Sequence, residues 1–215
     1  MRTPWILLGA LFLSGCQASG LSWGRSDPDA GPWALGFVTP YAMWGWVEDS
    51  ATVDVDGDFY RRIGSGASEG RKNGTPGASG WLVTGGGNER DVRDAKLPVR
   101  IYVRWQSVVE PQTYQGWIEI PESARQVMRD ALTKDCPERP ELKEIRIGVS
   151  VRLGLAPGGI VQVWALDECR RAVKVARGQA EIEPKGPDLG RSGYPPMQEA
   201  SKRYIEQYGI PYGSW

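Results

Sequence analysis

The residues that decide the fold are Pro98–Trp105, which read PVRIYVRW. In this stretch every odd position from Val99 onward is apolar, and the even positions from Arg100 to Arg104 carry arginine or tyrosine. Successive side chains of a β-strand point to opposite faces, so a period of two is typical of a strand with one face in a core and one on the surface. The sequence therefore predicts a half-buried strand here.

Similar β-prone runs lie on both sides of this strand. Tyr114–Ile120 and Ile145–Leu153 repeat the alternation, and the turn Ala156–Gly159 leads back into Ile160–Leu166. The other predicted strands are Trp33–Val38, Met43–Glu48, Ala51–Asp56, Phe59–Ile63 and Val173–Glu183. Many short strands separated by turns indicate sheets in which neighbours pair antiparallel.

Two segments have helical rather than strand periodicity. Ser123 and Gln126 form a capping-box pattern that starts a helix ending near Asp135, and Met197–Tyr208 predicts a second helix that Gly209 ends. The predicted fold class is mainly β, an antiparallel β-sandwich or a curled sheet with two short α-helices at its margin. An α+β arrangement is the alternative.

The segment Gly64–Ala95 is rich in glycine and shows no periodicity. Its only apolar cluster is Trp81–Val83, so we predict a mobile surface loop held at Trp81. The run Gly85–Gly87 is not part of a phosphate-binding Gly-x-x-x-x-Gly-Lys-Ser/Thr motif, and no apolar helix follows it.

Composition excludes several classes of function. The chain has 26 Lys and Arg residues, 26 Asp and Glu residues and no histidine. Nucleic acid is therefore not an expected partner, and mechanisms that need a histidine base or the usual zinc ligands are excluded. A carboxylate pair or a Ser-Lys dyad remains chemically open, but no spacing indicates either. We expect no enzyme activity, no metal and no cofactor.

The N-terminus resembles a bacterial lipoprotein signal peptide. A short apolar run, Trp5–Leu13, precedes Leu13-Ser14-Gly15-Cys16, which resembles a lipobox. The resemblance implies a signal peptide over 1–15, acyl chains on Cys16, a flexible tether over 16–32 and a single β-rich domain over 33–215. Gln17 favours the outer membrane, with the domain facing the periplasm. The alternative is an ordinary signal peptide, or a start codon assigned too early, with Cys16 incidental.

Two cysteines remain after Cys16, namely Cys136 and Cys169. An exported chain reaches an oxidising compartment, where disulfides persist, so we predict that these two form a bond. Two buried free thiols are the alternative.

Two constellations of charged residues are candidates for binding. Asp54, Asp56 and Asp58 resemble the start of a calcium loop, but the order of glycine and glutamate does not fit, and a hairpin turn with solvated acids is the favoured interpretation. The second constellation places four arginines on the polar faces of strands predicted to be neighbours, where they would grip carboxylates or phosphates. These are Arg100, Arg104, Arg146 and Arg152. The alternative is a solvated face paired with local acids.

Three separated segments carry a resemblance to a family. They are Leu97–Ser107 with Glu110–Tyr114, then Gly154–Gly159, and the ending Tyr208–Trp215. Together with the lipobox they resemble a family of short Gram-negative lipoproteins, found especially in pseudomonads, that is labelled a domain of unknown function. Members of this family resemble immunity proteins encoded beside antibacterial phospholipase effectors of the type VI secretion system.

The resemblance implies a membrane-anchored periplasmic protein that binds a secreted lipase effector and neutralises it. No catalytic residue comes with it, and only the lipidated Cys16 is carried over. As partner contacts we expect Trp81 in its loop and the arginine face of Arg100, Arg104 and Arg152. The alternative function is a structural envelope lipoprotein whose aromatic residues bind glycan or peptidoglycan strands.

Overall fold

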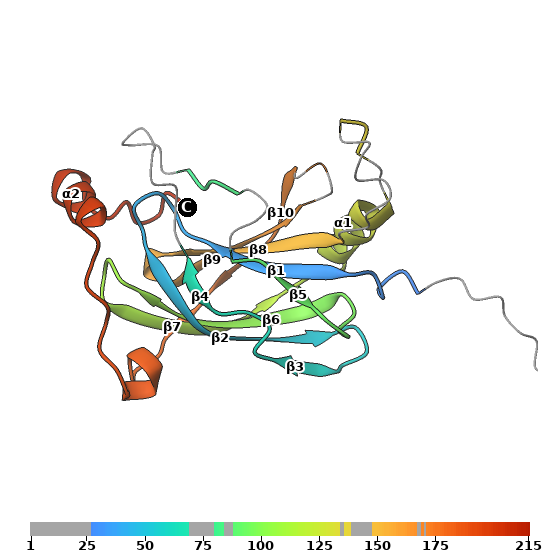
Figure 1. Ribbon diagram of the computed structural model, residues 1–215, viewed down its shortest axis with the longest axis horizontal. Helices are drawn as coiled ribbons and strands as arrows, with labels where there is room; N and C mark the ends of the chain where they lie inside the picture. The colour runs from blue at the N-terminus through green and yellow to red at the C-terminus, as the bar shows by residue number, and fades with distance from the viewer. Residues whose placement is uncertain are drawn as a thin grey trace, which may run out of the picture.

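The computed structural model describes residues 27–68, 80–83, 88–133, 136–138, 148–166, 169 and 171–215. Within them, two sheets face each other as layers (Figure 1). The five-stranded sheet has the order β10-β9-β8-β1-β5 and contains β1 (Trp33–Val38), β5 (Arg90–Val92), β8 (Val149–Ala156), β9 (Ile160–Leu166) and β10 (Ala172–Gln179). The six-stranded sheet has the order β11-β7-β6-β2-β3, with β4 also on β2, and contains β2 (Gly45–Asp54), β3 (Phe59–Arg61), β4 (Gly66–Ser68), β6 (Pro98–Ser107), β7 (Gln112–Glu119) and β11 (Glu181–Ile182).

The predicted fold class, a mainly β sandwich with two short helices, is confirmed. One pairing departs from the antiparallel rule, because β1 and β8 run parallel with Trp33 opposite Val149. These two strands are separated in sequence by most of the six-stranded sheet, and local sequence patterns do not show that they meet. Because a long connection precedes β8, this strand can pair with β1 in either the parallel or the antiparallel direction.

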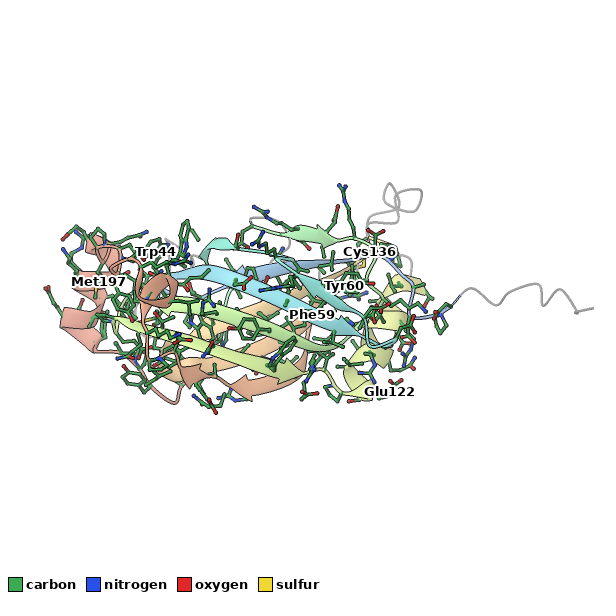
Figure 2. All side chains as sticks on the ribbon, turned by 90° about the horizontal axis from the view of Figure 1, so that it is seen from below. Trp44, Phe59, Tyr60, Glu122, Cys136 and Met197 are labelled. Carbon is green, nitrogen blue, oxygen red and sulfur yellow. A yellow bond between two sulfur atoms is a disulfide. The ribbon has the colours of Figure 1, made fainter. Side chains whose placement is uncertain are left out.

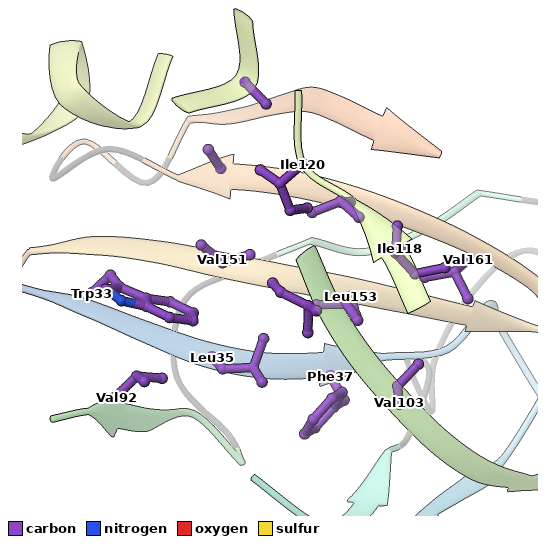
Figure 3. Packing of buried hydrophobic residues seen from close by; sticks show 14 of the residues in the cluster. Trp33, Leu35, Phe37, Val92, Val103, Ile118, Ile120, Val151, Leu153 and Val161 are labelled. Carbon is purple, nitrogen blue, oxygen red and sulfur yellow. The ribbon is translucent and has the colours of Figure 1, made fainter. Parts of the chain in front are cut away.

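The core fills the space between the two sheets. On β6 the alternation holds, since Ile101, Val103 and Trp105 are buried. They meet side chains from the facing sheet, among them Leu35 of β1 and Leu153 of β8 (Figure 3). Burying each such side chain contributes about 1.5–3 kcal/mol to folding, so the inner faces hold the two sheets together.

Several predicted strand boundaries were wrong, and Val173–Glu183 is divided between β10 and β11, which lie in different sheets. Most of Met43–Glu48 and of Ala51–Asp56 belongs to one continuous strand, β2, whose pairing with β6 shifts register between Val47 and Asp49. A bulge at this point absorbs the extra residue without ending the strand. The segment Gly64–Ala95 is not a single loop either, because it contains β4 and β5. Gly85–Gly87 lies outside the described residues.

Two helices close opposite ends of the sandwich (Figures 1 and 2). Helix α1 (Glu122–Thr133) starts one residue before Ser123, so Ser123 is not its cap; instead the Pro121 carbonyl accepts the amides of Ala124 and Arg125. Helix α2 (Glu199–Tyr208) ends as predicted at Gly209, which has a φ of 71° and donates its amide to Ile205. No described helix is long and apolar enough to cross a bilayer.

The domain begins earlier than Trp33. Asp27 forms a 2.6 Å ion pair with Lys96, Asp29 forms one of the same length with Arg129 of α1, and the Asp29 carbonyl accepts the amide of Leu97 at 2.9 Å. The hydrogen bond to Lys96 lowers the pKa of Asp27. Residues 27–32, predicted as tether, are therefore fixed to the domain. The predicted signal peptide, Cys16 and the tether before residue 27 lie outside the described residues.

The predicted disulfide between Cys136 and Cys169 is confirmed, with a Cα–Cα distance of 5.2 Å. It joins the chain after α1 to the connection between β9 and β10. Glu138 lies beside the two sulfurs and completes a group with the residue types of a metal site. Metal ligation needs thiolates, so the bonded sulfurs do not act as such ligands.

Candidate functional site

The predicted contact residues lie on opposite sides of the molecule. Arg152 is on β8 and Trp81 packs over the same sheet, whereas Arg100 and Arg104 are on β6 of the other sheet. The prediction of one continuous arginine face was wrong, because β6 and β8 are in different layers and not neighbours. Arg146 lies outside the described residues.

The outer face of the five-stranded sheet, which we call the covered face, is closed over Arg152. This side chain is only 1% exposed and forms a 2.6 Å ion pair with Glu89. Gly36 on the neighbouring strand makes room for it, since a Cβ there would lie 1.9 Å from a guanidinium nitrogen. Arg152 therefore belongs to the packing of the domain and is not exposed to a partner.

Trp81 closes the next part of the covered face. Its ring packs edge-on against Trp164 of β9, with centroids 5.1 Å apart, and both rings lie over Gly154. Val83 packs against the same cluster, and Asn88 accepts the amide of Phe37. Within the predicted mobile loop, Trp81, Val83 and Asn88 are thus packed against the covered face.

The outer face of the six-stranded sheet, which we call the open face, is covered by the described residues only toward α2. There the carboxylate of Glu48 accepts hydrogen bonds from Arg104 at 2.7 Å, from Gln106 at 2.8 Å and from the backbone amide of Asp188 at 2.6 Å. Burial works against the charged form, but the hydrogen bond to Glu48 raises the pKa of Arg104. Asp188 lies in the short helix η3 (Pro187–Gly190), which therefore holds Arg104 in place.

The rest of the open face carries an aromatic patch, which we define as Phe59, Arg61, Arg100, Tyr102 and Trp117. Strand register places these residues on the same face in two adjacent rows. Phe59 is 55% exposed and Trp117 is 38% exposed. Figure 2 views the molecule from the side of this sheet and labels Phe59 on it.

Trp117 is the centre of the aromatic patch. Its ring centroid lies 5.5 Å from that of Tyr102 and 6.2 Å from that of Phe59, and the guanidinium carbon of Arg100 lies 4.6 Å from it. Tyr102 donates its hydroxyl to Gln115 at 2.9 Å, and burial raises the pKa of Tyr102. The four side chains form a preformed surface in which an aromatic ring is stacked under a cation.

The three aspartates near the first hairpin have a structural role. Asp54 is buried, and its carboxylate accepts the backbone amides of Asp56, Asp58 and Lys96. Asp56 forms an ion pair with Lys96. The expectation of solvated acids is therefore wrong for Asp54, which fixes the hairpin turn.

The three segments that carry the family resemblance converge near α2. Glu110 accepts the amide of Gly158 at 2.9 Å and the hydroxyl of Tyr212 at 2.7 Å. The indole of Trp215 donates to the Pro157 carbonyl at 3.2 Å. Burial and the hydrogen bond to Glu110 raise the pKa of Tyr212 to about 12. The C-terminus is thus docked against the domain, and these residues stabilise the fold.

Sequence reasoning identified Arg100 but missed Phe59, Arg61 and Trp117 as its neighbours. The alternation of β7 could have identified Trp117. Gln115, Trp117 and Glu119 lie on the polar, outward side of this strand, where a tryptophan is unusual. The register that brings Phe59 beside them is set by the hairpin of β2 and β3, which the pattern of β7 does not show.

Comparison with known proteins identifies the family. A family model described as "Protein of unknown function (DUF2931)" matches residues 24–213. Because the match covers most of the chain, the protein belongs to this family. Neither the curated proteins nor the solved structures contain a match.

Proposed function

We propose that this DUF2931 protein is a lipid-anchored immunity protein of the periplasm, which binds a secreted lipase effector and neutralises it. The observation that carries the proposal is the aromatic patch. Exposed aromatic residues beside arginine are enriched at the energetic centres of protein interfaces. The patch lies on a rigid sheet, so binding would not require the domain to refold.

The N-terminus supports the proposal through location. Cys16 would hold the domain at the outer membrane, where a delivered lipase would meet its substrate. Restricting both proteins to the membrane surface raises their effective concentration and favours capture before hydrolysis. With residues 27–32 fixed to the domain, the tether spans 16–26, which is about 35–40 Å when extended.

Inhibition of the neighbouring effector is the direct experiment. The protein is purified, mixed with each product of the adjacent genes, and tested for co-purification and for inhibition of phospholipid hydrolysis in vesicles. We expect one lipase to form a stable complex and to lose activity. Absence of both results with every neighbouring product would falsify the proposal.

The anchor is tested in cells. Labelled palmitate should enter the wild-type protein and should not enter Cys16→Ser, and the variant should protect cells against the lipase less well. Purified Cys16→Ser protein should still inhibit the lipase in solution, because the aromatic patch is intact. Equal labelling of both proteins would exclude Cys16 as the lipidation site.

A further inference from the structure

We propose that the aromatic patch is the surface that receives the effector, and that the effector presents an apolar side chain flanked by carboxylates. This inference rests on the proposed function and specifies its binding site. The two exposed aromatic rings provide the apolar contact, and Arg61 and Arg100 provide the positive charges beside them.

The patch is preorganised for binding. Trp117 contacts Phe59, Tyr102 and Arg100 in the unbound protein, so its ring loses little freedom when a partner covers it. The Tyr102 hydroxyl is already satisfied by Gln115. Burying this surface therefore removes apolar area from water without leaving the hydroxyl of Tyr102 unpaired.

The charges of the patch point to an acidic partner. Arg100 lies opposite Glu119 in the strand register, yet within the described part of the chain neither Arg100 nor Arg61 forms an ion pair. Arg104, two residues along the same strand, is engaged by Glu48. Arg61, and Arg100 with its guanidinium over Trp117, therefore keep donors that can pair with carboxylates of a partner.

The same features disfavour two other occupants. A second copy docked by a two-fold axis at Trp117 would bring Arg100, whose guanidinium lies 4.6 Å from this ring, near its own equivalent, and like charges oppose such a contact. A glycan strand stacks best on rings that share one plane, whereas Trp117 is tilted by 50° to Phe59 and by 51° to Tyr102.

The test uses the lipase encoded by the neighbouring gene as the probe. Trp117→Ala should weaken the affinity about 30-fold or more, as truncation of a central interface residue does. Arg100→Glu should weaken it comparably, mainly by slowing association, and should reduce the salt dependence of the association rate. Thermal unfolding of each variant checks that the domain is folded.

Matched controls lie on the other sheet. Val173→Ala removes a side chain that is 46% exposed, and Lys174→Glu reverses a charge; both are on β10. We expect these two variants to bind the lipase as the wild type does. Arg61→Ala should cause a smaller loss of affinity than Arg100→Glu, because it removes a charge without reversing it.

The outcomes separate this inference from the proposed function. If the wild type binds the lipase and both Trp117→Ala and Arg100→Glu bind equally well, the assigned surface is wrong while the proposed function stands. If the wild type does not bind, the proposed function and this inference both fail. If the wild type self-associates and Arg100→Glu abolishes this, the patch binds a second copy and not an effector. If the wild type binds isolated peptidoglycan and Trp117→Ala abolishes this, the patch binds a glycan and not an effector.

Discussion

The covered face and the open face differ although their strands follow the same rule. In β8 and in β6, apolar side chains point into the core and arginines point away from it. Arg152 is nevertheless buried under Glu89, whereas Arg100 lies on the surface over Trp117. The alternation along a strand determines the face of the sheet on which a side chain lies. Whether that face is exposed to solvent depends on a separate segment of the chain that packs over it or does not.

The two faces therefore have different tasks. On the covered face, the charged and aromatic side chains contact other residues of the same domain, so replacing them should lower the free energy of unfolding. On the open face the same residue types are exposed, so that replacing them should affect binding and leave stability nearly unchanged.

The largest effect is expected for Arg152→Ala on the covered face. The substitution removes a buried cation, leaves a cavity beside Gly36 and breaks the ion pair between Arg152 and Glu89. The free energy of unfolding should fall by about 3–5 kcal/mol. Urea denaturation followed by tryptophan fluorescence measures it.

Arg100→Ala is the control on the open face, and it should change the free energy of unfolding by less than about 0.5 kcal/mol. Equal losses for the two arginines would contradict the division between the faces. A stable Arg152→Ala protein would mean that the segment over β8 opens readily in solution.

A smaller loss is expected for Gly154→Ala, which tests the contact between the cover and the sheet. A Cβ at this position would lie 2.5 Å from the rings of both Trp81 and Trp164, so one ring must move. The expected cost is about 1–3 kcal/mol, measured by thermal unfolding. Gly80→Ala is the matched control, because an added Cβ there meets nothing within 4 Å. No change in Gly154→Ala would show that Trp81 is not held on the sheet.

The sequence predicted the inner faces of the sheets well. Strands β1 and β9 have the predicted bounds, and the inward residues of β6 are those of the alternation. A strand with one buried face has a clear period of two in its hydrophobicity, because every inward side chain must be apolar. Gly209 likewise marked the end of α2, because its backbone conformation is one that glycine adopts without strain.

The sequence did not predict which strands share a sheet. The arginines of β6 and β8 have the same local pattern, and only the parallel pairing of β8 with β1 separates them into two layers. The packing of Trp81 against the domain was predicted and is confirmed, but the strands that it contacts were not predicted. The segment around Trp81 contacts β8 and β9 through a few large side chains, and such contacts leave no periodic signal.

The boundary between the two kinds of surface is tested by Glu48→Gln. Glu48 binds Arg104, Gln106 and the loop amide of Asp188, and its side chain is largely buried. Removing its charge weakens these hydrogen bonds, and the free energy of unfolding should fall by about 1.5 kcal/mol. Faster hydrogen exchange of the Asp188 amide would show that η3 has loosened. Unchanged exchange would mean that η3 is held by other contacts.

The smallest effect concerns the ionisation of Tyr102 on the open face. Burial is the main cause of its raised pKa, and the ring of Trp117 lies 5.5 Å away. Trp117→Ala should admit water to Tyr102 and bring its pKa down toward the usual value of about 10. Tyr60, whose raised pKa also comes mainly from burial, donates to Asp94 and should not change.

The sign of the linked stability change follows from the direction of the shift. A tyrosine with a raised pKa favours the folded state while it is neutral, and this contribution is present below about pH 10 and is lost as the pH rises through the raised pKa. In Trp117→Ala this alkaline loss should be smaller and should end at a lower pH, because the folded-state pKa of Tyr102 then lies nearer the usual value of about 10. Loss of the ring contacts of Trp117 should lower the free energy of unfolding at neutral pH by about 1 kcal/mol. Tyrosine absorbance and unfolding followed across alkaline pH measure both quantities. An unchanged pKa of Tyr102 in Trp117→Ala would show that the strand beneath Tyr102, rather than Trp117, excludes water from its hydroxyl. The aromatic patch would then be less tightly packed than its ring distances indicate.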